Sequence, residues 1–183
     1  DSLDHASSVF EHLYFGPEHS LREEKLAIEK TLAHESGYEI RQLDEIEEVT
    51  ASLLSDGEIV ARCAGPMEWG ARALGNRSIL ASGQDYRVVE ELNNAIKQRD
   101  FWMPFAPAIK SESSTRYLDN PKNSNTQFMT STFRTSEEAR KDLAAGTHPR
   151  DQTVRAQAVS QTSNYNFHKL LSFFEEKTGR SGL

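Results

Sequence analysis

The stretch GPMEWGARALGNRSILA, residues 65–81, breaks the regular patterning of the chain. Glycines at positions 65, 70 and 75 make it too irregular for a helix and too rich in glycine for an ordinary strand. Glycine lets the main chain approach a ligand closely, and Arg72, Asn76 and Arg77 add hydrogen-bond donors. This combination favours an anion-binding loop. A glycine-marked turn with solvated arginines is an equal alternative on spacing alone.

The segments around this loop predict a mixed α/β domain. Short β-branched runs predict strands at EIVARCA (58–64), SILA (78–81) and TVRAQAVS (153–160). Amphipathic or capped stretches predict helices over residues 20–34, 45–56, 86–98 and 164–179. The order helix, strand, glycine-rich loop is a setting in which α/β proteins place ligand sites.

Local end signals support three of these helices. Ser20 and Glu23 form a capping box, and Asp44 is the expected cap of the second helix. Gly57 and Gly179 are expected to end helices in the left-handed conformation. In the 86–98 helix the expected buried stripe consists of Val88, Leu92 and Ile96.

Composition excludes several classes of protein. The net charge of −7 argues against a nucleic-acid surface, although a small anion needs only a few local charges. The single cysteine, Cys63, forms no intrachain disulfide and is expected to be a buried strand residue. We find no zinc-like cluster, no apolar run of about 20 residues and no signal-peptide pattern, so we expect no metal ion ligated by the chain's own side chains, no membrane contact and a cytoplasmic location.

Five blocks of the sequence resemble the C-terminal domain of the carbamoyltransferases, the nodulation and antibiotic-tailoring enzymes. GPMEWGARALGNRSIL is similar to the family's GxMEFGPRALGNRSIL, and KQRDFWMPFAPAI (97–109) is similar to its KxRExFRPFAPxV. THPRDQTVRAQAVS (147–160) resembles THxDGTxRxQTV, and HLYFGPEHS (12–20) resembles NxYLGPxYS. FHKLLSFFEEKTGRSGL (167–183) resembles the helix before the family's LLNTSFN strand.

The resemblance implies an architecture and an activity. It implies one YrdC-like domain over residues 1–183, a twisted mixed β-sheet flanked by helices, with an actin-like domain preceding it in the full-length protein. Such domains react carbamoyl phosphate with ATP, accompanied by Mg²⁺, to give carbamoyl adenylate, and the actin-like domain transfers the carbamoyl group to a hydroxyl. The family's S-x-N strand would begin just after Leu183, so we expect a sheet truncated at its C-terminal end and no transfer by this chain alone.

The resemblance also turns basic residues into candidates for the site. Lys97 and Arg155 are predicted to be catalytic, because positive charge on the phosphoryl oxygens favours adenylation. The predicted substrate-binding residues are Arg72, Asn76, Arg77, Arg99 and Thr153. The alternative for the charged ones is a surface salt bridge, and Asn76 and Arg77 are equally suited to holding loop carbonyls. Glu68 is expected to be structural, paired with an arginine.

Three departures from the family pattern bear on the site. Met103 replaces the arginine of FRPFAP, and Pro66 and Ala71 replace a basic residue and a proline. These changes indicate a separate branch with a different acceptor or a rearranged site. Two other functions stay open: a YrdC-like RNA-binding module, since some relatives of the domain work on tRNA, and an interaction domain without chemistry, which Met103 favours.

Overall fold

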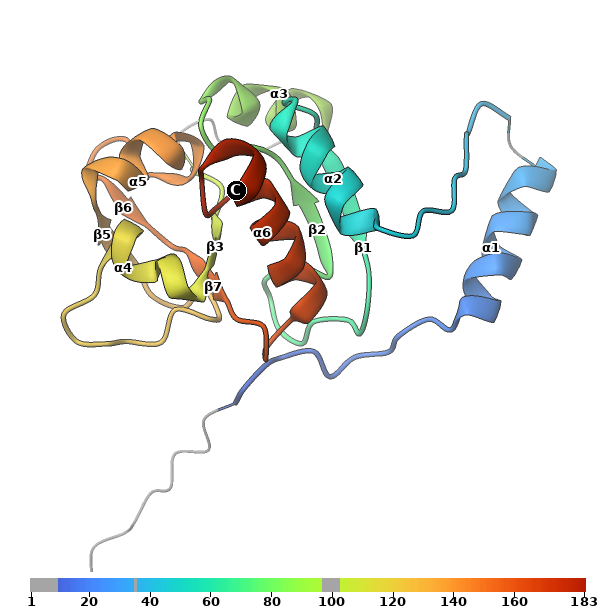
Figure 1. Cartoon of the computed structure of the whole chain (residues 1–183), viewed down its shortest axis with the longest axis horizontal. Coiled ribbons are helices and arrows are strands. Elements are labelled where there is room, and N and C mark those ends of the chain that lie inside the picture. Colours follow the sequence, from blue (N-terminus) through green and yellow to red (C-terminus); the bar gives the residue numbers. More distant parts are fainter. Residues whose placement is uncertain (1–9, 35, 97–102) are drawn as a thin grey trace, which may run out of the picture.

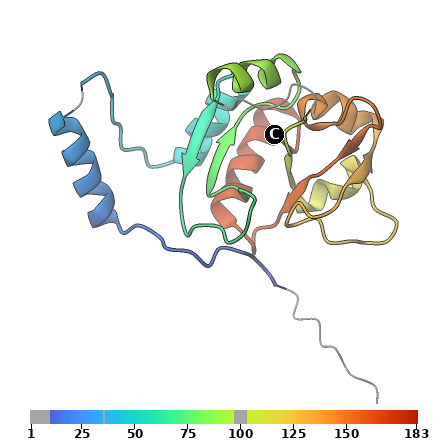
Figure 2. The same cartoon turned by 180° about the vertical axis from the view of Figure 1, so that it is seen from behind.

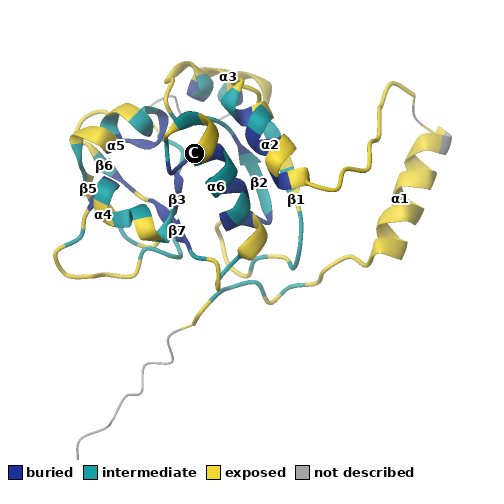
Figure 3. Cartoon of the chain, viewed as in Figure 1, coloured by how far each residue is buried: buried dark blue, intermediate teal, exposed yellow. Residues whose placement is uncertain are grey.

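The computed structural model of the chain describes residues 10–34, 36–96 and 103–183. Its main body is mixed α/β, as expected, and α1 (Leu21–His34) stands apart from that body (Figure 1). Every side chain described in α1 is exposed (Figure 3). Ser20 and Glu23 form the expected capping box at its start, with the Ser20 N–H donating to Glu23 Oε2 at 2.8 Å.

The first half of the core lies between two helices and a hairpin. Buried residues of α2 (Ile46–Ser55) and α6 (Tyr165–Thr178) belong to one apolar cluster, which includes Leu54, Leu171 and Phe174. The antiparallel strands β1 (Val60–Cys63) and β2 (Arg77–Leu80) complete this half. Burying apolar surface between these elements is the main force that holds them together.

The second half is built from short strands. β3 (Ala108–Lys110) pairs in parallel with β7 (Gln157–Val159), and residues 181–183 run antiparallel along the other edge of β3. The antiparallel sheet consists of β4 (Leu118–Asp119), β5 (Phe133–Thr135) and β6 (Thr153–Val154). The remaining helices are α3 (Arg87–Ala95), α4 (Ser114–Tyr117) and α5 (Glu137–Asp142), with 3-10 turns at Ser111–Ser113 and Ala144–Gly146.

The strands therefore differ from the expected single twisted sheet. Within the described residues they form three small sheets, and the YrdC-like arrangement is not confirmed. The predicted strand 153–160 is two strands, β6 and β7, which belong to different sheets. Arg155 and Ala156 are the residues at which the chain crosses from one sheet to the other.

Three local predictions are wrong for reasons of tertiary context. Asp44 does not cap α2, which begins after Glu45 without a side-chain cap. The predicted buried stripe of α3 is confirmed at Leu92 only, because Val89 is buried in place of the half-buried Val88 and Ile96 is exposed. Cys63 is exposed, because β1 alternates between half-buried and exposed positions in its two-stranded sheet. The predicted helix ends at Gly57 and Gly179 are confirmed by their positive φ angles of 93° and 74°.

Candidate functional site

The connection between β1 and β2 is a loop folded around the carboxylate of Glu68. Its Oε1 accepts hydrogen bonds from the backbone N–H groups of Leu74 (2.9 Å), Asn76 (2.7 Å) and Arg77 (3.0 Å). Converging backbone N–H groups of this kind form an anion-binding nest. In this chain the nest already holds an anion, which is the side chain of Glu68.

Arg77 and Asn76 brace the same loop through its carbonyl oxygens. Arg77 Nη1 donates to the carbonyls of Ala64 (3.1 Å) and Gly65 (3.0 Å), and Asn76 Nδ2 donates to that of Pro66 (2.8 Å). Charge-assisted bonds to several carbonyls at once fix the path of an irregular backbone. These contacts are those expected of Asn76 and Arg77 if they hold the loop carbonyls rather than bind a substrate.

The loop is also tied to the start of α6. Asn164 caps this helix by accepting from the Phe167 N–H at 3.1 Å, and its Nδ2 donates to Asn76 Oδ1 at 2.8 Å. Gly75 has a φ of 107°, and a Cβ at that position would overlap the Phe167 ring. Glycine is therefore required here both for its conformation and for its lack of a side chain.

A segment near the N-terminus lies along the outer edge of the loop. The Gly16 N–H donates to the Met67 carbonyl at 2.9 Å, and the Trp69 N–H donates to the Leu13 carbonyl at 2.7 Å. Figure 2 shows this segment beside the β1–β2 connection. Two of the sequence blocks that resemble the family, 12–20 and 65–80, thus meet in space.

Leu74 joins the loop to both the N-terminal segment and β7. Its carbonyl oxygen accepts from Tyr14 Oη at 2.7 Å and from Gln157 Nε2 at 2.9 Å. Burial raises the pKa of Tyr14, partly offset by its side-chain hydrogen bonds, so the phenol stays a neutral donor at ordinary pH. Gln157 brings a third family-like block, 147–160, into contact with the glycine loop.

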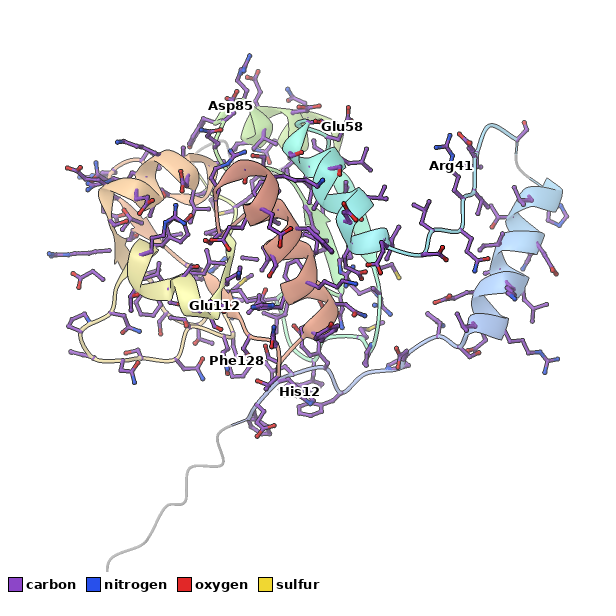
Figure 4. All side chains as sticks on the ribbon, in the orientation of Figure 1. His12, Arg41, Glu58, Asp85, Glu112 and Phe128 are labelled. Carbon is purple, nitrogen blue, oxygen red and sulfur yellow. The ribbon has the colours of Figure 1, made fainter. Side chains whose placement is uncertain are left out.

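A small hollow lies at this junction. It holds about one water molecule (about 10 Å³) and is lined by His12, Leu13, Tyr14, Leu74, Gln127, Phe128, Gln157, Ala158 and Ser163. His12 and Phe128 mark its position in Figure 4, at the opposite end of the body from Glu58. Among the lining residues, Gln127, Gln157 and Ser163 have uncharged polar side chains.

The predicted site residues that the structure describes differ in their exposure and in their contacts. Arg72 is exposed and forms no hydrogen bond or ion pair with any residue in the described part of the chain. Arg155 is exposed at the crossing between β6 and β7, and it has at least one contact. Thr153 donates through Oγ1 and its N–H to Asp151 Oδ1, at 2.8 and 3.0 Å. Lys97 and Arg99 lie outside the described residues.

One cation near the loop was not anticipated. The Arg62 side chain from β1 is only 8% exposed, lies 5.9 Å from the Phe167 ring centroid and is 3.9 Å from Glu47. Burial lowers its pKa, an effect opposed by the charge of Glu47. No sequence signal marks Arg62, because its burial depends on the packing of α2 and α6 against β1.

Other residues at this junction were not anticipated, for similar reasons. Tyr14 and Gln157 lie inside quoted blocks, but nothing in the sequence shows that they meet at Leu74. Met103, where the family has arginine, is 36% exposed.

No group of histidine, cysteine, aspartate and glutamate suited to a metal ion occurs in residues 10–34, 36–96 and 103–183. In the same ranges no helix has the length and apolarity to span a membrane.

Comparison with known proteins supplies the context for this site. Residues 51–183 match the family described as the carbamoyltransferase C-terminus. The chain is 30% identical to nodulation protein NolNO of Sinorhizobium fredii over 91% of its own length and 24% of the relative's. It is 35% identical to 3'-hydroxymethylcephem-O-carbamoyltransferase of Streptomyces clavuligerus over 70% of its own length and 24% of the relative's. The chain thus spans about a quarter of the length of these relatives.

Proposed function

Because the chain belongs to the carbamoyltransferase family and corresponds to its C-terminal region, we propose that it binds carbamoyl phosphate and ATP. The product of this region is carbamoyl adenylate. Water first hydrolyses carbamoyl phosphate, which gives carbamate and inorganic phosphate. A carbamate oxygen then attacks the α-phosphorus of ATP, the bond between the α-phosphorus and the oxygen that bridges to the β-phosphorus breaks, and pyrophosphate leaves. Mg²⁺, when bound with ATP, would balance the charge of the pyrophosphate.

The hydrogen bond between Gln157 Nε2 and the Leu74 carbonyl, at 2.9 Å, is the observation that carries this proposal. It joins two family-like blocks that lie 83 residues apart in the sequence. Arg72 and Arg155 are each two residues from this contact, a chain distance of at most roughly 7 Å. Both arginines are exposed, and guanidinium groups close in sequence to such a contact suit a ligand that carries phosphate.

Arginine side chains, rather than loop amides, are the expected phosphate donors. The backbone N–H groups at 74, 76 and 77 are engaged with Glu68, so the loop acts as a rigid support for Arg72. Arg155 and Lys97 are proposed to stabilise charge during adenylation, with Arg99 and Thr153 in supporting contacts. Asn76 and Arg77 contribute to binding by holding the loop in shape.

Calorimetric titration of the 183-residue chain with carbamoyl phosphate tests the proposal. Arg72→Met should weaken binding about 10- to 100-fold, because one charge-assisted bond to phosphate is lost. Arg22→Met on the exposed helix α1 is the matched control and should bind like the unmodified chain. Equal binding by both variants would remove Arg72 from the site.

The two rival functions give different results in the same experiment. An RNA-binding module would bind tRNA with an affinity that falls steeply between two salt concentrations, and carbamoyl phosphate would not compete. An interaction domain without chemistry would bind neither ATP nor carbamoyl phosphate. Adenylate formation by Arg155→Met, corrected for folded fraction, separates a catalytic role from a structural one.

Transfer to a hydroxyl is proposed to need an actin-like domain of the same polypeptide. In that step the acceptor oxygen attacks the carbamoyl carbon and AMP leaves. Incubation of this chain with ATP, carbamoyl phosphate and a panel of sugars should give no carbamoylated product by mass spectrometry. Product above a no-protein control would place transfer chemistry within these 183 residues.

A further inference from the structure

The side-chain amide of Gln157 has a fixed orientation and an unused acceptor. Its nitrogen faces the Leu74 carbonyl at 2.9 Å, and a carbonyl oxygen can only accept, so this contact identifies the Nε2 end. The same nitrogen lies 3.5 Å from Tyr14 Oη, whose proton is given to Leu74. The other end, Oε1, is buried and has no donor among the residues that the structure describes.

A buried acceptor without a donor is costly, so its presence at this junction needs an explanation. Gln157 is only 3% exposed, and it lines the hollow between the N-terminal segment, the glycine loop and β7. The hollow has room for one group the size of a water molecule. An acceptor beside such a space is suited to a ligand group that carries N–H or O–H donors.

We infer that Gln157 is the specificity-determining residue that binds the –NH₂ of the carbamoyl group. This inference rests on the proposed function and adds the identity of the group recognised at the hollow. An amide –NH₂ donates two hydrogen bonds, has about the size of a water molecule, and distinguishes a carbamoyl group from an acetyl group of the same shape. Tyr14 acts as a positioning residue, because it shares the Leu74 carbonyl that orients the Gln157 amide.

Acetyl phosphate is the probe that isolates this contact. It carries the same phosphate as carbamoyl phosphate but has a methyl group in place of the –NH₂. A methyl group leaves the Gln157 acceptor without a donor, and sites built to bind a polar group reject analogues that lack it. We expect the unmodified chain to bind carbamoyl phosphate about 10- to 100-fold more tightly than acetyl phosphate.

Two variants test whether Gln157 is responsible. Gln157→Leu should bind the two acyl phosphates within about threefold of each other, because it removes the acceptor while the arginines remain. Gln161→Leu, an exposed residue on the same segment, should keep the full preference. The side-chain –NH₂ signals of Gln157 in a ¹⁵N spectrum of the unmodified chain should shift with carbamoyl phosphate and less with acetyl phosphate.

Each outcome bears on a separate statement. Equal affinity of the unmodified chain for both ligands, or a preference that survives in Gln157→Leu, overturns the assignment of Gln157 and leaves the proposed function standing. Absence of binding to either ligand overturns both. If Gln157→Leu does not fold, the affinity ratio of the unmodified chain and its side-chain spectrum still decide the matter.

Discussion

Replacing Glu68 with alanine should loosen the glycine loop more than any other exchange of a surface carboxylate. The side chain fills the nest formed by the N–H groups of Leu74, Asn76 and Arg77, at 2.7 to 3.0 Å. Alanine leaves these three donors without their acceptor. The loop path then depends on its remaining contacts, among them the bonds of Arg77 and Asn76 to the loop carbonyls.

The size of the loss in the free energy of unfolding follows from the number and kind of hydrogen bonds removed. A hydrogen bond to a charged group contributes about 1.5–3 kcal/mol to the free energy of unfolding. The three bonds share one oxygen, and Glu68 is half-buried. In the variant, water can therefore hydrogen-bond to some of the freed N–H groups and offset part of the lost stability. We therefore expect a total loss of about 3 kcal/mol, which corresponds to a fall in Tm of about 6–12 °C for a chain of this size.

Urea unfolding followed by circular dichroism measures this loss. Glu58→Ala is the matched control, because Glu58 is exposed at the far end of the body, and it should stay within about 0.5 kcal/mol of the unmodified chain. Glu68→Gln, which keeps one acceptor oxygen without the charge, should lose about half as much. Added acetate should stabilise Glu68→Ala by entering the empty nest and should leave the unmodified chain unchanged.

The reasoning would be refuted by equal urea midpoints for the Glu68 and Glu58 alanine variants. It would also be refuted if acetate stabilised both proteins to the same extent. Either result would mean that the carboxylate does not hold the loop, and that its backbone N–H groups are available to a ligand.

Three further predictions concern the surroundings of the site. Gly75→Ala should cost at least about 2 kcal/mol in urea unfolding, more than Gly70→Ala, because both have positive φ but only the first overlaps the ring of Phe167. Burial opposes the ionisation of Glu112, but hydrogen bonds from its own backbone N–H and from the imidazole of His168 lower its pKa from 4.5 to about 2. Its contribution to stability is thus present above about pH 4.5 and lost as the pH falls towards 2, so Glu112→Gln should flatten this part of the stability profile. Tyr14→Phe should cost about 1 kcal/mol in thermal unfolding, since one neutral hydrogen bond is removed; a cost indistinguishable from zero would deny it a positioning role.

Helices with local end signals could be predicted from the sequence. The capping box at Ser20 and the glycine at position 179 act on the residues next to them, so both ends are found where the pattern places them. The buried face of α3 could not be predicted in the same way. Val89 rather than Val88 is buried there, because the packing of the rest of the molecule selects the face.

The strands were less predictable because their partners are distant. Residues 153–160 have the alternation of one strand, but β6 pairs with β5 and β7 pairs with β3. The chain changes sheet at Arg155, and nothing local signals this change. The exposure of Cys63 likewise depends on which face of the β1–β2 hairpin the core covers.

The glycine loop was recognisable, but its internal chemistry was not. Glu68 was expected to pair with an arginine, whereas it accepts from three backbone N–H groups. The contact of Gln157 with Leu74 joins residues 83 apart and leaves no trace in spacing or composition. Identical residue types can therefore be assigned to binding or to bracing only once the tertiary contacts are known.

A ¹⁵N–¹H spectrum of the 183-residue chain, recorded during titration with carbamoyl phosphate, tests the central claim most directly. The account predicts saturable shifts of backbone amides in residues 70–73 and 155–158, with the signals of α1 unchanged. The amides bound to Glu68 should move only slightly, because the ligand does not displace that carboxylate. Saturable shifts confined to another surface, or none at concentrations that saturate the calorimetric signal, would contradict it.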